Sequence, residues 1–136
     1  MASSKAASTL MILLSVAALL LTCYAAGNDE PSCRLEDIRF TTAATGRVVR
    51  GQPEHKVTVE NLCSCPQQGV VVYCDADALA ASAGPVDRTK IRVLDKKGGL
   101  CLVDSGLEMF KGKPVTFTYA SRKTLEFTLY DATPRC

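Results

Sequence analysis

The sequence predicts an all-β fold, a small disulfide-stapled antiparallel β-sandwich of about seven to eight strands. The first observation is that apolar and polar residues alternate along several short segments, which is typical of strands with one face in a core and the other in water. The second is that turn-forming residues separate these segments at short intervals. The third is a set of cysteines spread over the same region of a 136-residue chain, which indicates a disulfide framework.

The predicted strands follow one another with little else between them. Period-two alternation or a continuous β-branched run marks the segments 37–41, 56–60, 70–73, 90–93, 115–119 and 125–130. The separating turn signals are Gly46, Gly51-Gln52-Pro53, Gly98-Gly99 and Gly112-Lys113-Pro114, among others. One short helical segment is predicted over 77–83. The chain therefore lacks the βαβ pattern of a nucleotide-binding domain.

The N-terminal segment, residues 1–25, is predicted to be a cleaved secretory signal peptide. It has a positively charged start, an apolar run over 10–21 and small residues at 25–27. The run is shorter than the ~20 apolar residues of a transmembrane helix, which disfavours an uncleaved anchor. Cleavage after Gly27 is an alternative to cleavage after Ala25. Residues 26–32 are expected to form a flexible lead-in.

Removing this leader makes the cysteine count even, because one of the seven cysteines, Cys23, lies within it. The others lie in a single cysteine-rich β domain over 33–136, as Cys33, Cys63, Cys65, Cys74, Cys101 and Cys136. An even number in a secreted chain predicts that all of them are paired. Cys63 and Cys65 are too close in sequence to pair with each other without strain, so each is expected to reach a different partner. The sequence leaves the connectivity open.

Charge and reactive residues argue against several functions. The net charge of +2 provides no basic footprint, so no nucleic-acid partner is expected. His55 is the only histidine, and because no nucleophile motif lies near it we interpret it as a half-buried strand residue. The spacing of Asp75 and Asp77 would suit a divalent cation, but a solvated loop is the preferred interpretation. We therefore expect no enzymatic activity, no cofactor and no metal.

Recognition is expected on exposed loops of the disulfide-fixed scaffold. The candidate receptor-binding residues are charged side chains of the 75–88 loop and of two hairpin tips, namely Asp75, Asp77, Arg88, Lys111, Lys113, Arg122 and Lys123. Two rival functions are a cell-wall or carbohydrate-binding module and a small hydrolase or transferase. The first requires an exposed aromatic platform, whereas the chain has no Trp, and Tyr73, Phe117, Tyr119 and Phe127 are expected to be needed in strands. No motif supports the second.

Two segments resemble the plant tapetum determinant family of small secreted cysteine-rich proteins. The first runs from Gly51 to Cys63 and carries Gly-x-Pro, the alternating Val57 and Val59, and Asn61 before the cysteine. The second starts as Cys101-Leu102-Val103-Asp104-Ser105-Gly106 and continues through Gly112 to Phe117-Thr118-Tyr119-Ala120. The order and spacing of the six cysteines also fit the family. His55 stands where the family usually has an aromatic residue, and Asp104 where it usually has Asn.

The resemblance implies a secreted ligand without enzymatic activity. Founding members of the family act through a leucine-rich-repeat receptor kinase on a neighbouring cell and direct anther cells toward the tapetal fate. For this chain the resemblance implies an apoplastic location, the extracellular domain of such a kinase as partner, and no membrane insertion after signal cleavage. The run after Cys74 differs from the family, which leaves the receptor and the tissue open.

Overall fold

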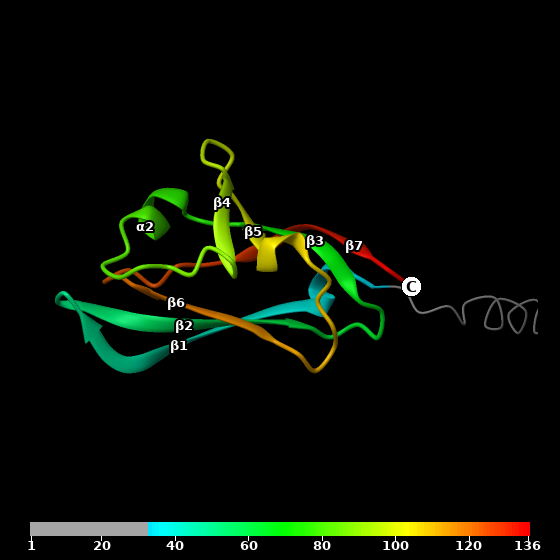
Figure 1. Cartoon of the computed structure of the whole chain (residues 1–136), viewed down its shortest axis with the longest axis horizontal. Helices are drawn as coiled ribbons and strands as arrows, with labels where there is room; N and C mark the ends of the chain where they lie inside the picture. The colour runs from blue at the N-terminus through cyan, green and yellow to red at the C-terminus, as the bar shows by residue number, and fades with distance from the viewer. Residues whose placement is uncertain (1–32) are drawn as a thin grey trace, which may run out of the picture. The chain divides into compact units, whose positions relative to one another are not determined.

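Two antiparallel sheets make up the fold in the computed structural model, which describes residues 33–136 (Figure 1). One sheet has the strand order β1-β2-β6, with β1 at Ile38–Val49, β2 at Gln52–Asn61 and β6 at Val115–Ala120. The other has the order β4-β5-β3-β7, with β3 at Gln67–Tyr73, β4 at Ile91–Asp95, β5 at Leu100–Val103 and β7 at Thr128–Pro134. The helical elements are η1 (Leu35–Asp37), α2 (Ala76–Ala80) and η2 (Asp104–Gly106). The predicted all-β, disulfide-stapled fold is confirmed, whereas the predicted signal peptide and lead-in lie outside the described residues.

One hydrophobic core lies between the two sheets, because alternate residues of the paired strands are buried. Val57 on β2 is aligned with Phe117 on β6, and Val72 on β3 is aligned with Cys101 on β5. These four side chains are at most 4% exposed. Further members of the core come from both sheets and from α2, including Ile38, Val59, Val70, Leu79, Ile91, Val103, Tyr119 and Phe127.

Two strand boundaries differ from the prediction. Strand β1 continues to Val49, because Gly46, which signals a turn in the sequence, lies instead in a bulge where the register with β2 shifts and has φ +87°. Strand β7 begins only at Thr128. Leu125 is buried as its alternation predicts, but its N–H donates to the side-chain hydroxyl of Tyr119 (2.7 Å) rather than to the backbone of a neighbouring strand.

Helix α2 also begins earlier than the predicted 77–83. Asp75 is its N-cap, since the Asp75 carboxylate accepts a hydrogen bond of 3.0 Å from the N–H of Ala78. The helix ends at Ala80, within the alanine-rich stretch. Its buried residues, Ala76 and Leu79, attach it to the core.

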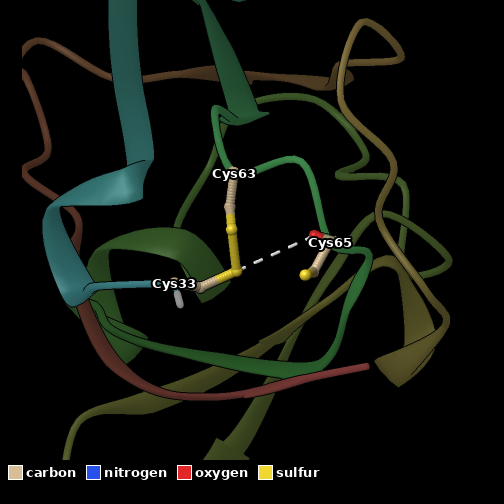
Figure 2. A group of neighbouring side chains, drawn as sticks. All are labelled: Cys33, Cys63 and Cys65. Carbon is tan, nitrogen blue, oxygen red and sulfur yellow. Dashed lines mark hydrogen bonds between the residues drawn. A yellow bond between two sulfur atoms is a disulfide. The ribbon is translucent and has the colours of Figure 1, made fainter. Parts of the chain in front are cut away.

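Three disulfides connect the six cysteines: Cys33–Cys63, Cys65–Cys136 and Cys74–Cys101. Cys63 and Cys65 therefore reach different partners, as predicted. Figure 2 shows the first disulfide beside Cys65, with the Sγ of Cys33 3.9 Å from the Cys65 carbonyl oxygen. The first described residue and the last residue of the chain are thus both linked to the turn between β2 and β3. The third disulfide joins the end of β3 to β5.

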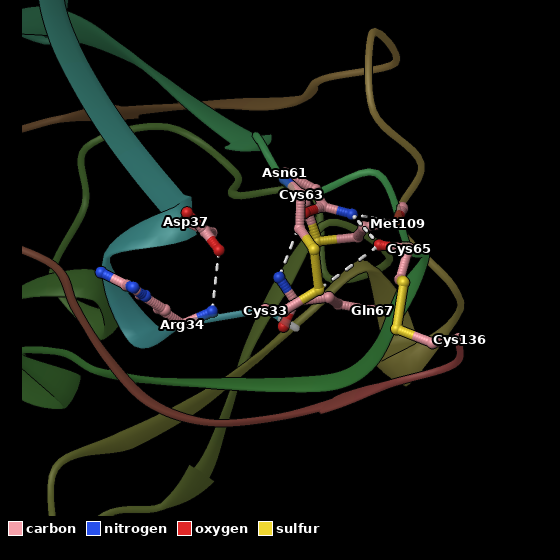
Figure 3. Close-up of a disulfide and its surroundings, with 9 residues drawn as sticks. All are labelled: Cys33, Arg34, Asp37, Asn61, Cys63, Cys65, Gln67, Met109 and Cys136. Carbon is pink, nitrogen blue, oxygen red and sulfur yellow. Dashed lines mark hydrogen bonds between the residues drawn. A yellow bond between two sulfur atoms is a disulfide. The ribbon is translucent and has the colours of Figure 1, made fainter. Parts of the chain in front are cut away.

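Asn61 stabilises the turn between β2 and β3 through buried hydrogen bonds (Figure 3). Its Nδ2 donates to the carbonyl oxygens of Cys65 and Met109, each at 2.9 Å. Its Oδ1 accepts from the N–H of Cys63 at 2.9 Å and from the side-chain amide of Gln67 at 3.1 Å. Asn61 and Gln67 are each 2% exposed, so these bonds replace water for groups that are otherwise buried. Asn61 thereby joins the end of β2, the cysteine-containing turn, the start of β3 and the segment before β6.

Replacing Asn61 by leucine tests this network. We expect Asn61→Leu to lower the free energy of unfolding by about 3 kcal/mol or more, because it leaves several buried backbone groups without a partner. Denaturant unfolding of the oxidised protein measures the change. Gln68→Leu is the matched control, because Gln68 is half-buried and makes no side-chain hydrogen bond within residues 33–136; its effect should stay within about 0.5 kcal/mol. Equal effects of the two substitutions would contradict the role assigned to Asn61.

Candidate recognition surface

Three of the predicted recognition residues meet at the N-terminal end of α2. The ammonium of Lys123, in the turn after β6, lies 3.0 Å from the Oδ2 of Asp75. Asp77 pairs instead with Lys96 of the β4–β5 turn, at 3.6 Å. Side chains from three separate loops therefore form one charged cluster of alternating sign. Arg122 is exposed next to Lys123.

Lys111 and Lys113 lie in a different place. They precede β6, whereas Arg122 and Lys123 follow it, and a strand of six residues separates its two ends by about 20 Å. The ammonium of Lys113 is 5.8 Å from the ring centroid of Phe110, which is 45% exposed. The basic residues of the two tips therefore do not form one patch. Arg88 belongs to a third place, the exposed loop between α2 and β4.

Each oxygen of the Asp75 carboxylate accepts a hydrogen bond from within the protein. One oxygen accepts the N–H of Ala78 as helix cap, and the other accepts from Lys123. The bond from Ala78, followed by the bond from Lys123, lowers the pKa of Asp75. Because Asp77 faces Lys96, the two carboxylates are used as a cap and as ion-pair partners rather than as a pair of oxygens facing one cation.

Two tyrosines add an aromatic element that the sequence analysis missed. Tyr73 on β3 and Tyr130 on β7 are 48% and 49% exposed, with their rings edge to face at 5.2 Å. Tyr73 also lines a cavity of about 520 Å³ together with Asp75, Asp77, Lys96 and Glu126. The expectation that Tyr73 is needed in a strand is correct, but its side chain lies on the solvent face of that strand. The alternation with the inward-facing Val70 and Val72 was the available signal.

His55 serves packing. It is 9% exposed, its ring stacks on Tyr119 with centroids 5.0 Å apart, and its Nε2 lies 3.0 Å from the carbonyl oxygen of Ser121. Because a carbonyl only accepts hydrogen bonds, Nε2 is the donor. The imidazole is thus more buried than predicted, and it fills with a planar ring the position where the resembling family usually has an aromatic residue.

The cysteine cluster at the β2–β3 turn is the densest set of potential metal ligands in the described part of the chain. The sulfurs of Cys33, Cys63 and Cys65 all lie within 4.8 Å of one another (Figure 2). Metal ions bind thiolates, and each of these sulfurs is in a disulfide. In the oxidised protein the cluster is therefore a pair of covalent cross-links.

None of the helices in residues 33–136 is long and apolar enough to cross a membrane.

The charge cluster at α2 makes a prediction about pH. The Asp75 carboxyl should titrate below the ordinary aspartate value of about 3.9, and Lys123→Met should raise its pKa only part of the way back, since the Ala78 bond remains. A lowered pKa stabilises the folded state above the unfolded pKa, and this contribution is lost as the pH falls through the folded value. Carboxyl NMR titration measures both values. Lys111→Met is the control, and a shift of the same size in that variant would contradict the assignment to Lys123.

Comparison with known proteins identifies the family of this chain. No curated protein and no solved structure matches the chain. The family model described as Tapetum determinant 1, C-terminal, matches residues 34–135, which include both sheets, the Cys74–Cys101 disulfide and the three loop regions described above. The chain therefore belongs to the tapetum determinant 1 family.

Proposed function

We propose that this protein is a secreted signalling ligand that binds the extracellular domain of a leucine-rich-repeat receptor kinase in the apoplast and acts in anther cell differentiation. The observation that carries the proposal is the family match over residues 34–135. The three disulfides support secretion, because such bonds form and persist in oxidising compartments.

The scaffold suits a ligand that acts by binding alone. Cross-links at the β2–β3 turn and between β3 and β5 hold the loops before contact, so that little ordering entropy is lost on binding. Charged side chains at α2 and at the 110–114 tip offer two separate polar faces to a partner. The His55 ring packs on Tyr119, and the Asp75 carboxylate caps α2. These structural roles support a function without enzymatic activity.

A carbohydrate-binding role is the second candidate, and one observation favours it. Tyr73 and Tyr130 are half exposed beside a cavity lined by Asp77, Lys96 and Glu126. Sugar rings stack on exposed aromatic faces while carboxylates and ammonium groups bind their hydroxyls. The two rings stand at 90° to each other and so form a corner rather than a flat platform, which makes this the weaker candidate.

Receptor binding is the direct test of the proposed function. The purified, oxidised protein should bind saturably to one member of a panel of plant leucine-rich-repeat receptor ectodomains, and reduction of its disulfides should abolish binding, because the loops lose their fixed positions. Surface-immobilised ectodomains allow the affinity to be measured. No binding across the panel by correctly oxidised protein would count against the proposal.

Charge reversal then identifies the face that is used. If the α2 cluster contacts the receptor, Arg122→Glu with Lys123→Glu should weaken binding about tenfold or more, while Lys111→Glu with Lys113→Glu should have little effect. The opposite ranking would assign contact to the 110–114 tip. Equal affinities of both double variants and the unmodified protein would exclude both tips as receptor contacts.

Retention on wall polysaccharides tests the second candidate. If sugars bind at the tyrosine corner, Tyr73→Ala with Tyr130→Ala should abolish retention, because the stacking faces are removed. Phe110→Ala is the matched control, since Phe110 is similarly exposed but lies in the 110–114 loop. Absence of retention of the unmodified protein would remove this candidate.

A further inference from the structure

A groove beside strand β4 has the features of a peptide-binding site. It encloses about 380 Å³ between β4 and the loop that follows α2. Its apolar lining comes from Leu79, Pro85, Val86, Ile91 and Val93. Val93 is 40% exposed, so apolar surface of the edge strand faces solvent here. The groove is separate from the tyrosine corner, with which it shares no lining residue.

The strand that borders the groove has an open edge. In the order β4-β5-β3-β7, β4 is a terminal strand and pairs only with β5. In an antiparallel pair, every second residue directs its backbone N–H and C=O away from the partner strand. The Lys90 carbonyl accepts from the N–H of Asp104 on the β5 side, so the backbone groups of Ile91 and Val93 face away from β5. The Ile91 N–H is bonded to the Asp87 carbonyl at 3.1 Å, which leaves the groups around Val93 as the template on which an extended segment can add.

The charges at the groove are positive. Arg88 and Arg92 are among its lining residues, and no acidic residue in the described part of the chain lines it. Both arginines are exposed, and neither makes an ion pair within residues 33–136. The nearby Asp87 is turned to Thr89, whose N–H and hydroxyl it accepts at 2.9 and 2.6 Å. The other nearby cation, Lys90, already pairs with Asp104 at 3.7 Å. Two guanidinium groups are therefore available for carboxylates of a ligand.

We propose that this groove binds an extended acidic segment of the partner protein, which adds as a strand beside β4, places an apolar side chain between Val86 and Val93, and directs flanking carboxylates to Arg88 and Arg92. The inference rests on the proposed ligand function and names the chemistry of its partner. The combination of free backbone groups, an apolar lining and unpaired guanidinium groups favours a peptide over a free amphiphilic acid, since the latter has no use for the strand edge.

A capped pentapeptide is the probe. Successive side chains on a strand point to opposite faces, so in glutamate-threonine-leucine-glutamate-threonine the first glutamate shares the face of the leucine, and the second lies on the opposite face, as Arg92 does relative to Val93. Backbone NMR titration of the purified, oxidised protein should show saturable shifts at Val86, Arg88 and Arg92. The same peptide with lysine in place of glutamate should bind at least about tenfold more weakly. Equal affinity for both peptides, or no shifts along β4, would overturn the proposal.

Variants separate the groove from the rest of the surface. Arg88→Glu with Arg92→Glu should weaken binding of the acidic peptide about tenfold or more, whereas Lys111→Glu with Lys113→Glu changes the net charge equally and should have little effect. Val86→Arg gives an independent test. The larger side chain, on the loop that follows α2, would cover the apolar lining, so this variant should bind the acidic peptide more weakly. Laurate that displaces the peptide and binds as tightly in the Arg88→Glu and Arg92→Glu variant would assign the groove to an apolar chain and overturn the peptide proposal.

Binding to the receptor ectodomain tests the groove and the proposed ligand function separately. If the unmodified protein binds a receptor and the Arg88→Glu and Arg92→Glu variant binds it equally well, the groove is not the docking site, while the proposed function stands. If no receptor binds but the acidic peptide does, the groove is confirmed and the receptor assignment fails. Parallel loss of peptide binding and receptor binding in this variant would support both.

Discussion

The turn formed by Cys63, Ser64 and Cys65 is the constraint on which the remainder of this fold depends. At this point the chain leaves the β1-β2-β6 sheet and enters the β4-β5-β3-β7 sheet, and the two cysteines bind Cys33 and Cys136. The bonds close loops with sequence separations of 30 and 71, for which chain-entropy estimates are about 4 kcal/mol each. Both ends of the domain are thus fixed where the two sheets are connected. Asn61 completes the turn by binding backbone groups that the disulfides would otherwise leave buried without partners.

The candidate recognition surface at α2 lies at the other end of the sheets from this turn (Figure 1). Helix α2, the β4–β5 turn and the turn after β6 are not cross-linked to the cysteine turn, and their positions depend on the Cys74–Cys101 disulfide, on the buried Leu79 and on the ion pairs of Asp75 and Asp77. Each ion pair is exposed and contributes little stability by itself. Their value lies in orienting loops from distant parts of the sequence toward a common surface. The run after Cys74, which differs from the family, lies within this surface.

The charged cluster and the tyrosine corner border the same cavity, whereas the arginine-flanked groove is a separate site. The first offers paired charges of both signs, the second aromatic faces beside carboxylates, and the third an open strand edge with unpaired cations. A protein ligand with a rigid scaffold can use more than one such face, because each contact orders little of the backbone. Binding of a receptor and of a further partner would then be independent in structure.

Much of the architecture was determined by the sequence alone. Alternation such as that of Val57, Val59, Phe117 and Tyr119 predicts strands and their buried faces, because the period of a strand is two whatever its neighbours are. The even number of cysteines beyond the predicted leader predicts complete pairing, and their order with the Gly51–Cys63 motif indicates the family. The pairing itself, the bulge at Gly46 and the late start of β7 were decided by tertiary structure, since each depends on which segments lie side by side. The same holds for the candidate sites. A period-two pattern places Tyr73 on the face opposite to Val70 and Val72, but it cannot show that Tyr73 lies beside Tyr130 or that β4 is an edge strand, because these facts arise only when the sheets are assembled.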